Sequence, residues 1–114
     1  MMLVFLIPQR IREPENILIR TKQFFKKLSE ELSKPASKKR NHEIEEYAEL
    51  LAELANVNRY NNDKEDYIAW ATDLRDLSLS LAKEAEEKDV DDNKMHNLHR
   101  QMKAKCGACH DVYQ

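Results

Sequence analysis

Apolar residues recur at intervals of three and four positions in four stretches of this chain, and this period constrains the fold more than any other feature. Such a period belongs to amphipathic helices, each of which buries one stripe of its surface. The 114 residues include 1 Gly and 3 Pro, too few for a loop-rich all-β sandwich or a Gly-rich nucleotide-binding fold. We therefore predict an all-α protein, an antiparallel up-down-up-down four-helix bundle.

Polar or proline-containing links separate the four predicted helices. Pro14 suits a first helical turn, Pro35 ends the first helix, and Asn41 is the expected cap of the second. A coiled-coil dimer of longer helices is disfavoured, because Pro35 and the asparagines within residues 56–62 interrupt the pattern. The expected helices run from Pro14 to about Ser33, from His42 to Val57, from Asp63 to about Lys83, and from near Asp89 to the carboxyl end.

Charge is unevenly distributed along the chain. Residues 1–40 hold 10 Lys or Arg and 4 Asp or Glu, a net charge of +6, whereas residues 41–114 hold 9 and 17, a net charge of −8. This asymmetry is either an ordinary solvated helix surface or a two-sided surface for docking a redox partner. The overall net charge of −2 does not indicate a nucleic-acid-binding protein.

The amino-terminal segment is apolar. Residues 1–7 read MMLVFLI, far shorter than the roughly 20 residues that span a bilayer. The run resembles the apolar part of a secretory signal, but it lacks a basic start and a small-residue cleavage site. We expect residues 1–13 to be the remnant of an export signal or an apolar tail folded onto the domain. Residues 14–114 are expected to form the domain, with no transmembrane segment elsewhere.

The chemistry-bearing motif lies near the carboxyl end. Cys106, Cys109 and His110 form a C-x-x-C-H pattern, which is the pattern of covalent haem c attachment. On a helix the two thiols share one face, so both can reach the two vinyl groups at one edge of a porphyrin. The imidazole of His110 then lies where it can bind the iron axially. The small residues Gly107 and Ala108 let the macrocycle approach the backbone.

Three other interpretations of the motif compete with haem attachment. A thioredoxin-like redox pair requires a βαβ context, and no strand pattern is present. Zinc binding by His96, His99 and the two cysteines requires a helix break before Cys106, because four ligands on one straight helix cannot surround one ion. No Gly or Pro between His99 and Cys106 provides that break. An accidental occurrence in a cofactor-free helical interaction module is the third alternative.

Four helices with C-x-x-C-H on the last one resemble the class II cytochromes c, the cytochrome c prime family. The segment from Cys106 to Tyr113 is similar to the family's C-x-x-C-H-x-x-Tyr/Phe, although Gln114 stands where the family often carries a basic residue. The resemblance implies one covalent haem c on Cys106 and Cys109, His110 as the proximal ligand, and export to the periplasm or another non-cytoplasmic compartment. Homodimers through the first two helices are common in the family, so a homodimer is a further candidate state.

The distal side of the iron determines the expected function. In the family this residue comes from the first helix and follows an arginine by four positions, which resembles Arg20 and Phe24 here. The resemblance implies Arg20 near a haem propionate and Phe24 over the iron, with Phe25 or Leu28 under a register shift. We predict five-coordinate iron that binds small gases such as NO or CO, because an apolar pocket offers no donor to a bound charge. The alternative is a low-spin electron-transfer cytochrome.

The remaining candidate ligands are weaker. Met1 and Met2 lie far upstream, and Met95 and Met102 are expected in the core. His42 is either a surface residue or a sixth ligand, and His96 and His99 are expected at the surface or rim. Tyr113, Tyr67 and Trp70 are expected either to line the porphyrin or to pack in the core. No nucleophile–base pair or carboxylate dyad is apparent, so catalysis is not predicted.

Overall fold

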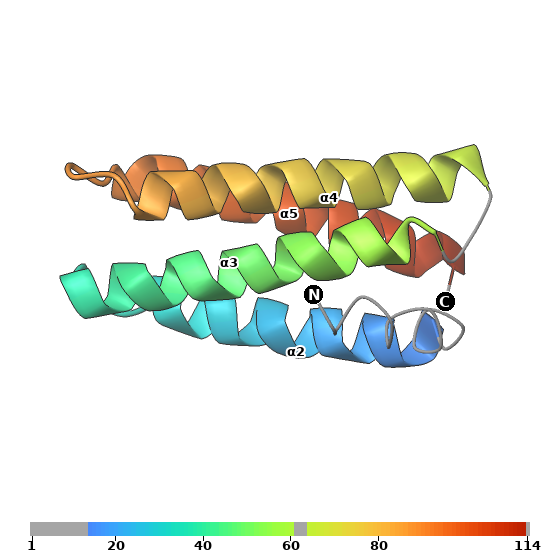
Figure 1. Ribbon diagram of the computed structural model, residues 1–114, viewed down its shortest axis with the longest axis horizontal. Helices are drawn as coiled ribbons and strands as arrows, with labels where there is room; N and C mark the ends of the chain where they lie inside the picture. The colour runs from blue at the N-terminus through green and yellow to red at the C-terminus, as the bar shows by residue number, and fades with distance from the viewer. Residues whose placement is uncertain (1–13, 61–63, 114) are drawn as a thin grey trace, which may run out of the picture.

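The protein is an all-α four-helix bundle. The computed structural model describes residues 14–60 and 64–113, and for residues 14–18 and 106–113 it describes the helical backbone alone. These residues form α2 (Pro14–Leu32), α3 (Lys38–Asn58), α4 (Glu65–Ala85) and α5 (Asp92–Tyr113). Successive helices run in opposite directions (Figure 1), so the predicted up-down-up-down bundle is confirmed. The expected amino-terminal segment, residues 1–13, lies outside the described residues.

The helices do not all approach one another equally. The pairs that are consecutive in the chain, α2 with α3, α3 with α4 and α4 with α5, pack closely, whereas α2 and α5 approach each other less closely. Closure of the bundle between its first and last helices therefore depends on a few side-chain contacts, described below.

The core contains the predicted inner stripes. Leu28 of α2, Ile44 and Leu51 of α3 and Leu81 of α4 are completely buried. Met95 and Met102 of α5 are buried to the same extent, which confirms their expected place in the core. Burial of such side chains stabilises the fold by roughly 1.5–3 kcal/mol each. Half-buried side chains pack against this core: Phe24, Phe25, Tyr47, Leu77, Val90 and Leu98.

Helix α3 begins four residues earlier than predicted. Its cap is Ser37, whose Oγ accepts a hydrogen bond of 3.0 Å from the backbone N–H of Arg40, so the expected cap at Asn41 is wrong. A basic first turn is unfavourable for the helix dipole. Here the penalty is offset because the Arg40 side chain is bound by acceptors from other parts of the chain.

Helices α4 and α5, in contrast, begin later than predicted. Helix α4 starts at Glu65 after Lys64, which makes no side-chain capping hydrogen bond, and the expected first residue, Asp63, lies outside the described residues. Helix α5 starts at Asp92 rather than near Asp89. The carboxylate of Asp91 accepts a hydrogen bond of 3.1 Å from the backbone N–H of Lys94, which satisfies one of the donors left open at a helix start.

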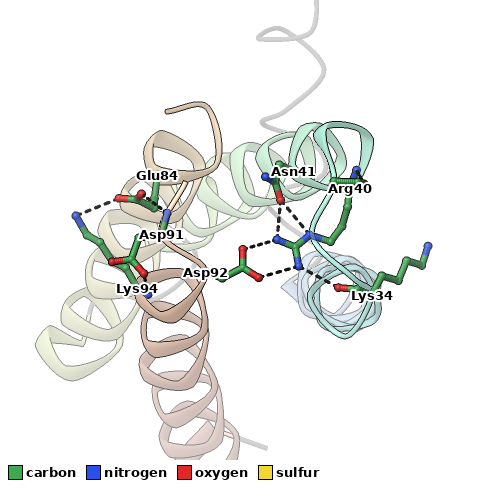
Figure 2. Close-up of polar contacts among 8 residues, drawn as sticks. Lys34, Arg40, Asn41, Glu84, Asp91, Asp92 and Lys94 are labelled. Carbon is green, nitrogen blue, oxygen red and sulfur yellow. Dashed lines mark hydrogen bonds and ion pairs between the residues drawn. The ribbon is translucent and has the colours of Figure 1, made fainter. Parts of the chain in front are cut away.

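A buried arginine joins three segments at one end of the bundle (Figure 2). The Arg40 side chain is 3% exposed, and its guanidinium forms hydrogen bonds of 2.6 and 3.2 Å to the two carboxylate oxygens of Asp92. It also donates to the carbonyl oxygen of Lys34 and to the side-chain oxygen of Asn41. Arg40 thus connects the α2–α3 link, the first turn of α3 and the first turn of α5.

Among the described residues, no helix combines the length and the apolar character that a membrane span needs.

Candidate functional site

The three residues of the C-x-x-C-H motif lie on the last turns of α5. The helix is continuous from Asp92 to Tyr113, so Cys106, Cys109 and His110 occupy the positions i, i+3 and i+4 of one helix. Positions with this spacing share a helix face. The side chains of these residues and of Tyr113 lie outside the described residues.

These last turns lie at the end of the bundle where α2 begins. Figure 1 shows the carboxyl end of α5 at the same end as the first turns of α2 and α4 and the last turn of α3. The Arg40–Asp92 contact marks the opposite end. The site predicted from the sequence is therefore separated from this polar contact by most of the length of the bundle.

His99 sets the register between α2 and α5. Its imidazole stacks on the ring of Phe25, with centroids 4.9 Å apart and planes 5° from parallel, and its Nε2 lies 2.8 Å from the Oγ of Ser29. The Ser29 hydroxyl donates its single proton to the carbonyl oxygen of Phe25. With that proton used, the contact between Oγ and Nε2 is satisfied by the tautomer that carries the imidazole proton on Nε2. His99 thus packs between the helices, which is more than the surface or rim position expected from the sequence.

The surroundings of His99 disfavour its protonated form. Partial burial lowers the pKa of the imidazole below its ordinary value, and the neighbouring His96 and Lys103 lower the pKa further. A charged imidazole would lose hydration and would add a positive charge beside two basic groups. His99 is consequently a neutral bridge between α5 and α2.

The positions of the motif on α5 are close in rotation to the residues of α5 that face α2 and the core. His110 follows His99 by eleven residues, which places it three turns further along and rotated by roughly 20°. Cys109 follows the buried Met102 by seven residues and is rotated by a similar small angle. The positions of the motif thus extend from the core stripe of α5 to the stripe that faces α2.

Arg20 and Phe24 lie on the segment of α2 opposite this part of α5. Cys106 lies about 10 Å beyond His99 along the axis, which corresponds in antiparallel α2 to a position about seven residues before Phe25. Arg20 and Phe24 fall between these two levels. Arg20 is exposed, whereas Phe24 is half-buried, with its ring centroid 6.3 Å from that of Tyr47 on α3.

The other side of α5 is attached to α4 next to the motif. The ammonium of Lys105, one residue before Cys106, lies 3.1 Å from a carboxylate oxygen of Asp73. Tyr67, in the first turns of α4, is buried and donates a hydrogen bond of 2.6 Å to the side-chain oxygen of Asn58. Trp70, one turn further along, is half-buried. The expected aromatic residues of α4 are thus at the same end of the bundle as the motif.

His42 lies at the wrong end of the bundle to be a sixth ligand of a haem on Cys106 and Cys109. It is in the first turns of α3, near the Arg40–Asp92 contact, and its side chain is 65% exposed. Its Nε2 lies 3.0 Å from a carboxylate oxygen of Glu46. Of the two interpretations of His42, surface residue or sixth ligand, the structure supports the surface residue.

Zinc binding is disfavoured by the geometry of α5. No break separates His99 from Cys106, so the two are about 10 Å apart along one helix, far beyond the span of a tetrahedral site. His99 is bound to Ser29 and stacked on Phe25, while His96 is exposed. Among the residues whose side chains are described, no group of three or more His, Cys, Asp or Glu is arranged to hold a metal ion.

Of two interactions near the site that the sequence analysis did not identify, one could have been found from the sequence. His99 lies four residues after Met95 and three before Met102, and this spacing places it beside the core stripe, so its partial burial was readable. The pairing of Lys105 with Asp73 could not be predicted, because many exposed lysines and carboxylates have equivalent positions in the pattern.

No family model, curated protein or solved structure matches the chain.

Proposed function

We propose that the protein is an exported monohaem cytochrome with one covalent haem c, five-coordinate and able to bind a small gas such as NO or CO. The observation that carries the proposal is the placement of Cys106, Cys109 and His110 at i, i+3 and i+4 on one continuous helix. That helix faces α2 through His99, and it approaches α2 less closely than the consecutive helices approach one another.

The donor set fits a covalently held haem. Two thiols on one helix face suit addition to the two vinyl groups of one porphyrin edge, and a histidine directly after them suits axial ligation. When bound, haem would supply an iron that exchanges one electron or takes a diatomic ligand. The Cys106 and Cys109 thiols would fix the macrocycle to α5, and His110 would hold the iron through its imidazole.

Residues of α2 would shape the distal side. Phe25 is stacked on His99, and Leu28 is completely buried in the core, which leaves Phe24 as the half-buried aromatic residue nearest the motif on the inner side of α2. Its ring offers no lone pair to iron and would exclude water from the distal face. Arg20, exposed one turn earlier, would reach a propionate from the rim.

Electron transfer is the second candidate function. The observation that favours it is the distribution of charge between the helices: α2 and α5 hold eight Lys or Arg and five Asp or Glu, whereas α3 and α4 hold five and ten. A molecule with faces of opposite sign is steered toward charged partners and oriented as it docks.

The test is production of the full chain in a host with haem-attachment machinery, followed by mass spectrometry under denaturing conditions. We expect the mass of one haem to remain on the chain after acid denaturation, because thioethers are not reducible. Visible spectra are expected to show high-spin ferrous iron that changes on addition of CO. A sharp low-spin spectrum would indicate electron transfer, and an unmodified mass would exclude both haem functions in favour of a cofactor-free module.

Matched variants assign the ligands. Cys106→Ser with Cys109→Ser is expected to abolish the covalent mass, whereas His110→Ala is expected to retain the thioethers and lose the normal ferrous spectrum. His99→Gln changes a histidine on the same helix that contacts Phe25 and Ser29, and it should keep both the mass and the axial ligand. A normal spectrum in His110→Ala would refute the assignment of the proximal ligand.

A further inference from the structure

Positive charge concentrates along the seam between α2 and α5. Residues 19–29 of α2 and residues 93–105 of α5 face one another in antiparallel register through Phe25 and His99, and neither segment contains Asp or Glu. By sequence order α5 belongs to the acidic part of the chain, so only the fold brings its basic residues beside those of α2. We define the α2–α5 edge by its exposed basic side chains: Lys22, Lys26, His96, Arg100 and Lys103.

The contacts of His99 place these side chains on one surface. Lys22 lies one heptad before Ser29, which contacts His99, and is therefore on the same stripe of α2. Lys103 follows His99 by one turn, and His96 precedes it by one turn. Both basic groups are close enough to His99 to lower the pKa of its imidazole.

Among the described side chains, no carboxylate neutralises the lysines and the arginine of the α2–α5 edge. Lys94 and Lys105, the other lysines of this part of α5, are paired with Glu84 and Asp73 of α4. Across the residues with described side chains, no ion pair joins Lys22, Lys26, Arg100 or Lys103 to a carboxylate. Unpaired like charges in a cluster repel one another, and binding of an oppositely charged surface relieves this repulsion.

We infer that the α2–α5 edge is the docking surface for an acidic patch of a partner protein. The opposite helices, α3 and α4, carry a net charge of −5 that would repel such a partner, so it is guided to this edge. The edge runs along α5 toward Cys106, Cys109 and His110. Identification of the partner as a redox protein rests on the proposed function, whereas the docking surface itself does not.

Other occupants fit less well. Within the described residues 19–29 and 93–105, Ile19 is the large hydrophobic side chain that is more than half exposed, which is little apolar surface for membrane insertion. Duplex DNA is a rigid polyanion that would extend past the edge toward the acidic helices, whereas a flexible acidic segment can follow the edge. A second copy of this chain would place its acidic α3–α4 face on the basic edge, and such a head-to-tail contact does not close into a dimer.

The test is a titration of the isotope-labelled full chain with poly-L-glutamate, followed by NMR at an ionic strength of about 0.01 M, where the screening length is about 30 Å. The amide signals of Lys22, Lys26, Arg100 and Lys103 are expected to shift, and those of α3 to stay in place. Lys26→Glu with Lys103→Glu is expected to weaken binding by about tenfold or more. The matched reversal Glu49→Lys with Glu53→Lys, at exposed positions of α3, should leave binding unchanged or tighter.

Three results would overturn the inference. The first is equal loss of binding in both double variants, or shifts that map to α3 and α4. The second is tighter binding of this edge to anionic lipid vesicles or duplex DNA than to poly-L-glutamate. The third is self-association of the chain through the edge without added ligand. None of these measurements involves haem, so they are independent of the mass and spectrum that test the proposed function.

Discussion

The imidazole of His99 on α5 lies parallel to the ring of Phe25 on α2, with 4.9 Å between their centroids. The same imidazole is 2.8 Å from the hydroxyl oxygen of Ser29, so one neutral histidine makes both an aromatic and a polar contact across the loosest neighbouring pair of helices. Its protonation state therefore affects how well the bundle is closed.

The stability of the fold should decrease when His99 is protonated. Its folded-state pKa is lowered, so below the ordinary value of 6.5 the unfolded chain binds more protons than the folded chain. We expect the free energy of unfolding to fall as the pH drops through about 6.5, with the full loss below the folded pKa. Urea unfolding followed by circular dichroism at several pH values measures this change.

His99→Gln is expected to remove this component of the pH dependence and to cost about 1–2 kcal/mol at neutral pH through the lost stacking and hydrogen bond. The control is His42→Gln, which removes an exposed histidine of α3. If the slope near pH 6 survives in His99→Gln, another group is responsible for it.

Asp92→Asn should destabilise the end of the bundle where α3 and α5 begin. The variant leaves the buried guanidinium of Arg40 without its carboxylate. Because the Asp92 side chain is 41% exposed, we expect a loss of about 1–2 kcal/mol, less than for a fully buried pair. Calorimetry against Asp89→Asn, an exposed residue of the same loop, measures the difference.

The same pair predicts an acid dependence. The hydrogen bonds from Arg40 lower the pKa of Asp92 in the folded protein. The contribution of the Asp92 carboxylate to the free energy of unfolding is therefore complete above the ordinary pKa of 3.8, and it is lost as the pH falls through the folded pKa. Asp92→Asn should therefore be less sensitive to acid in this range than the parent chain. Equal acid sensitivity of the two proteins would contradict this role.

Ser78→Ala is expected to stabilise the protein. Ser78 is completely buried in α4, and its hydroxyl has no hydrogen-bond partner among the described residues. Removal of an unsatisfied buried hydroxyl and a better helix propensity should together raise the free energy of unfolding by about 1 kcal/mol. Ser80→Ala, at an exposed position of α4, gains only the propensity and is the matched control for thermal unfolding.

Met102→Ala should be among the most damaging single substitutions in α5. Met102 is completely buried in the core cluster, and its truncation is expected to cost about 2–4 kcal/mol through lost burial and a residual cavity. Met102→Leu, of similar volume, should cost less than about 1.5 kcal/mol. The midpoint of urea unfolding should shift without a change of slope, and a changed slope would indicate an altered folded or unfolded state.

Phe24→Met tests the distal assignment in the haem-loaded protein. A thioether can ligate haem iron, whereas a phenyl ring cannot. If Phe24 faces the iron, the variant is expected to become low-spin and to bind CO more weakly, while Phe24→Leu stays high-spin. A high-spin spectrum in Phe24→Met would place another residue over the iron.

The helices were predictable from the sequence because the apolar period is strong and uninterrupted in each. The inner positions of α3, such as Ile44 and Leu51, followed directly from this period. The start of α3 was not predictable, because the advantage of Ser37 over Asn41 depends on Arg40 reaching Asp92, which is 52 residues away. Tertiary contacts of this kind override a local capping preference.

The helix that carries the motif was predictable from the sequence. The apolar period predicted a last helix through Cys106, Cys109 and His110, and α5 is continuous over all three positions. Periodicity within one segment does not specify the rotation of one helix against another. For this reason the sequence left the contact of His99 with α2 and the juxtaposition of the two basic segments undetermined.

The long-range contacts that α5 makes with α2 and α3 also bear on the order of folding. The Arg40–Asp92 and Ser29–His99 contacts join residues 52 and 70 positions apart, whereas the other close packing is between helices that follow one another in the chain. Forming such long loops costs conformational entropy before any contact is gained. We expect the three helical hairpins to assemble first and the first and last helices to meet late, so weakening this closure should speed unfolding more than it slows folding.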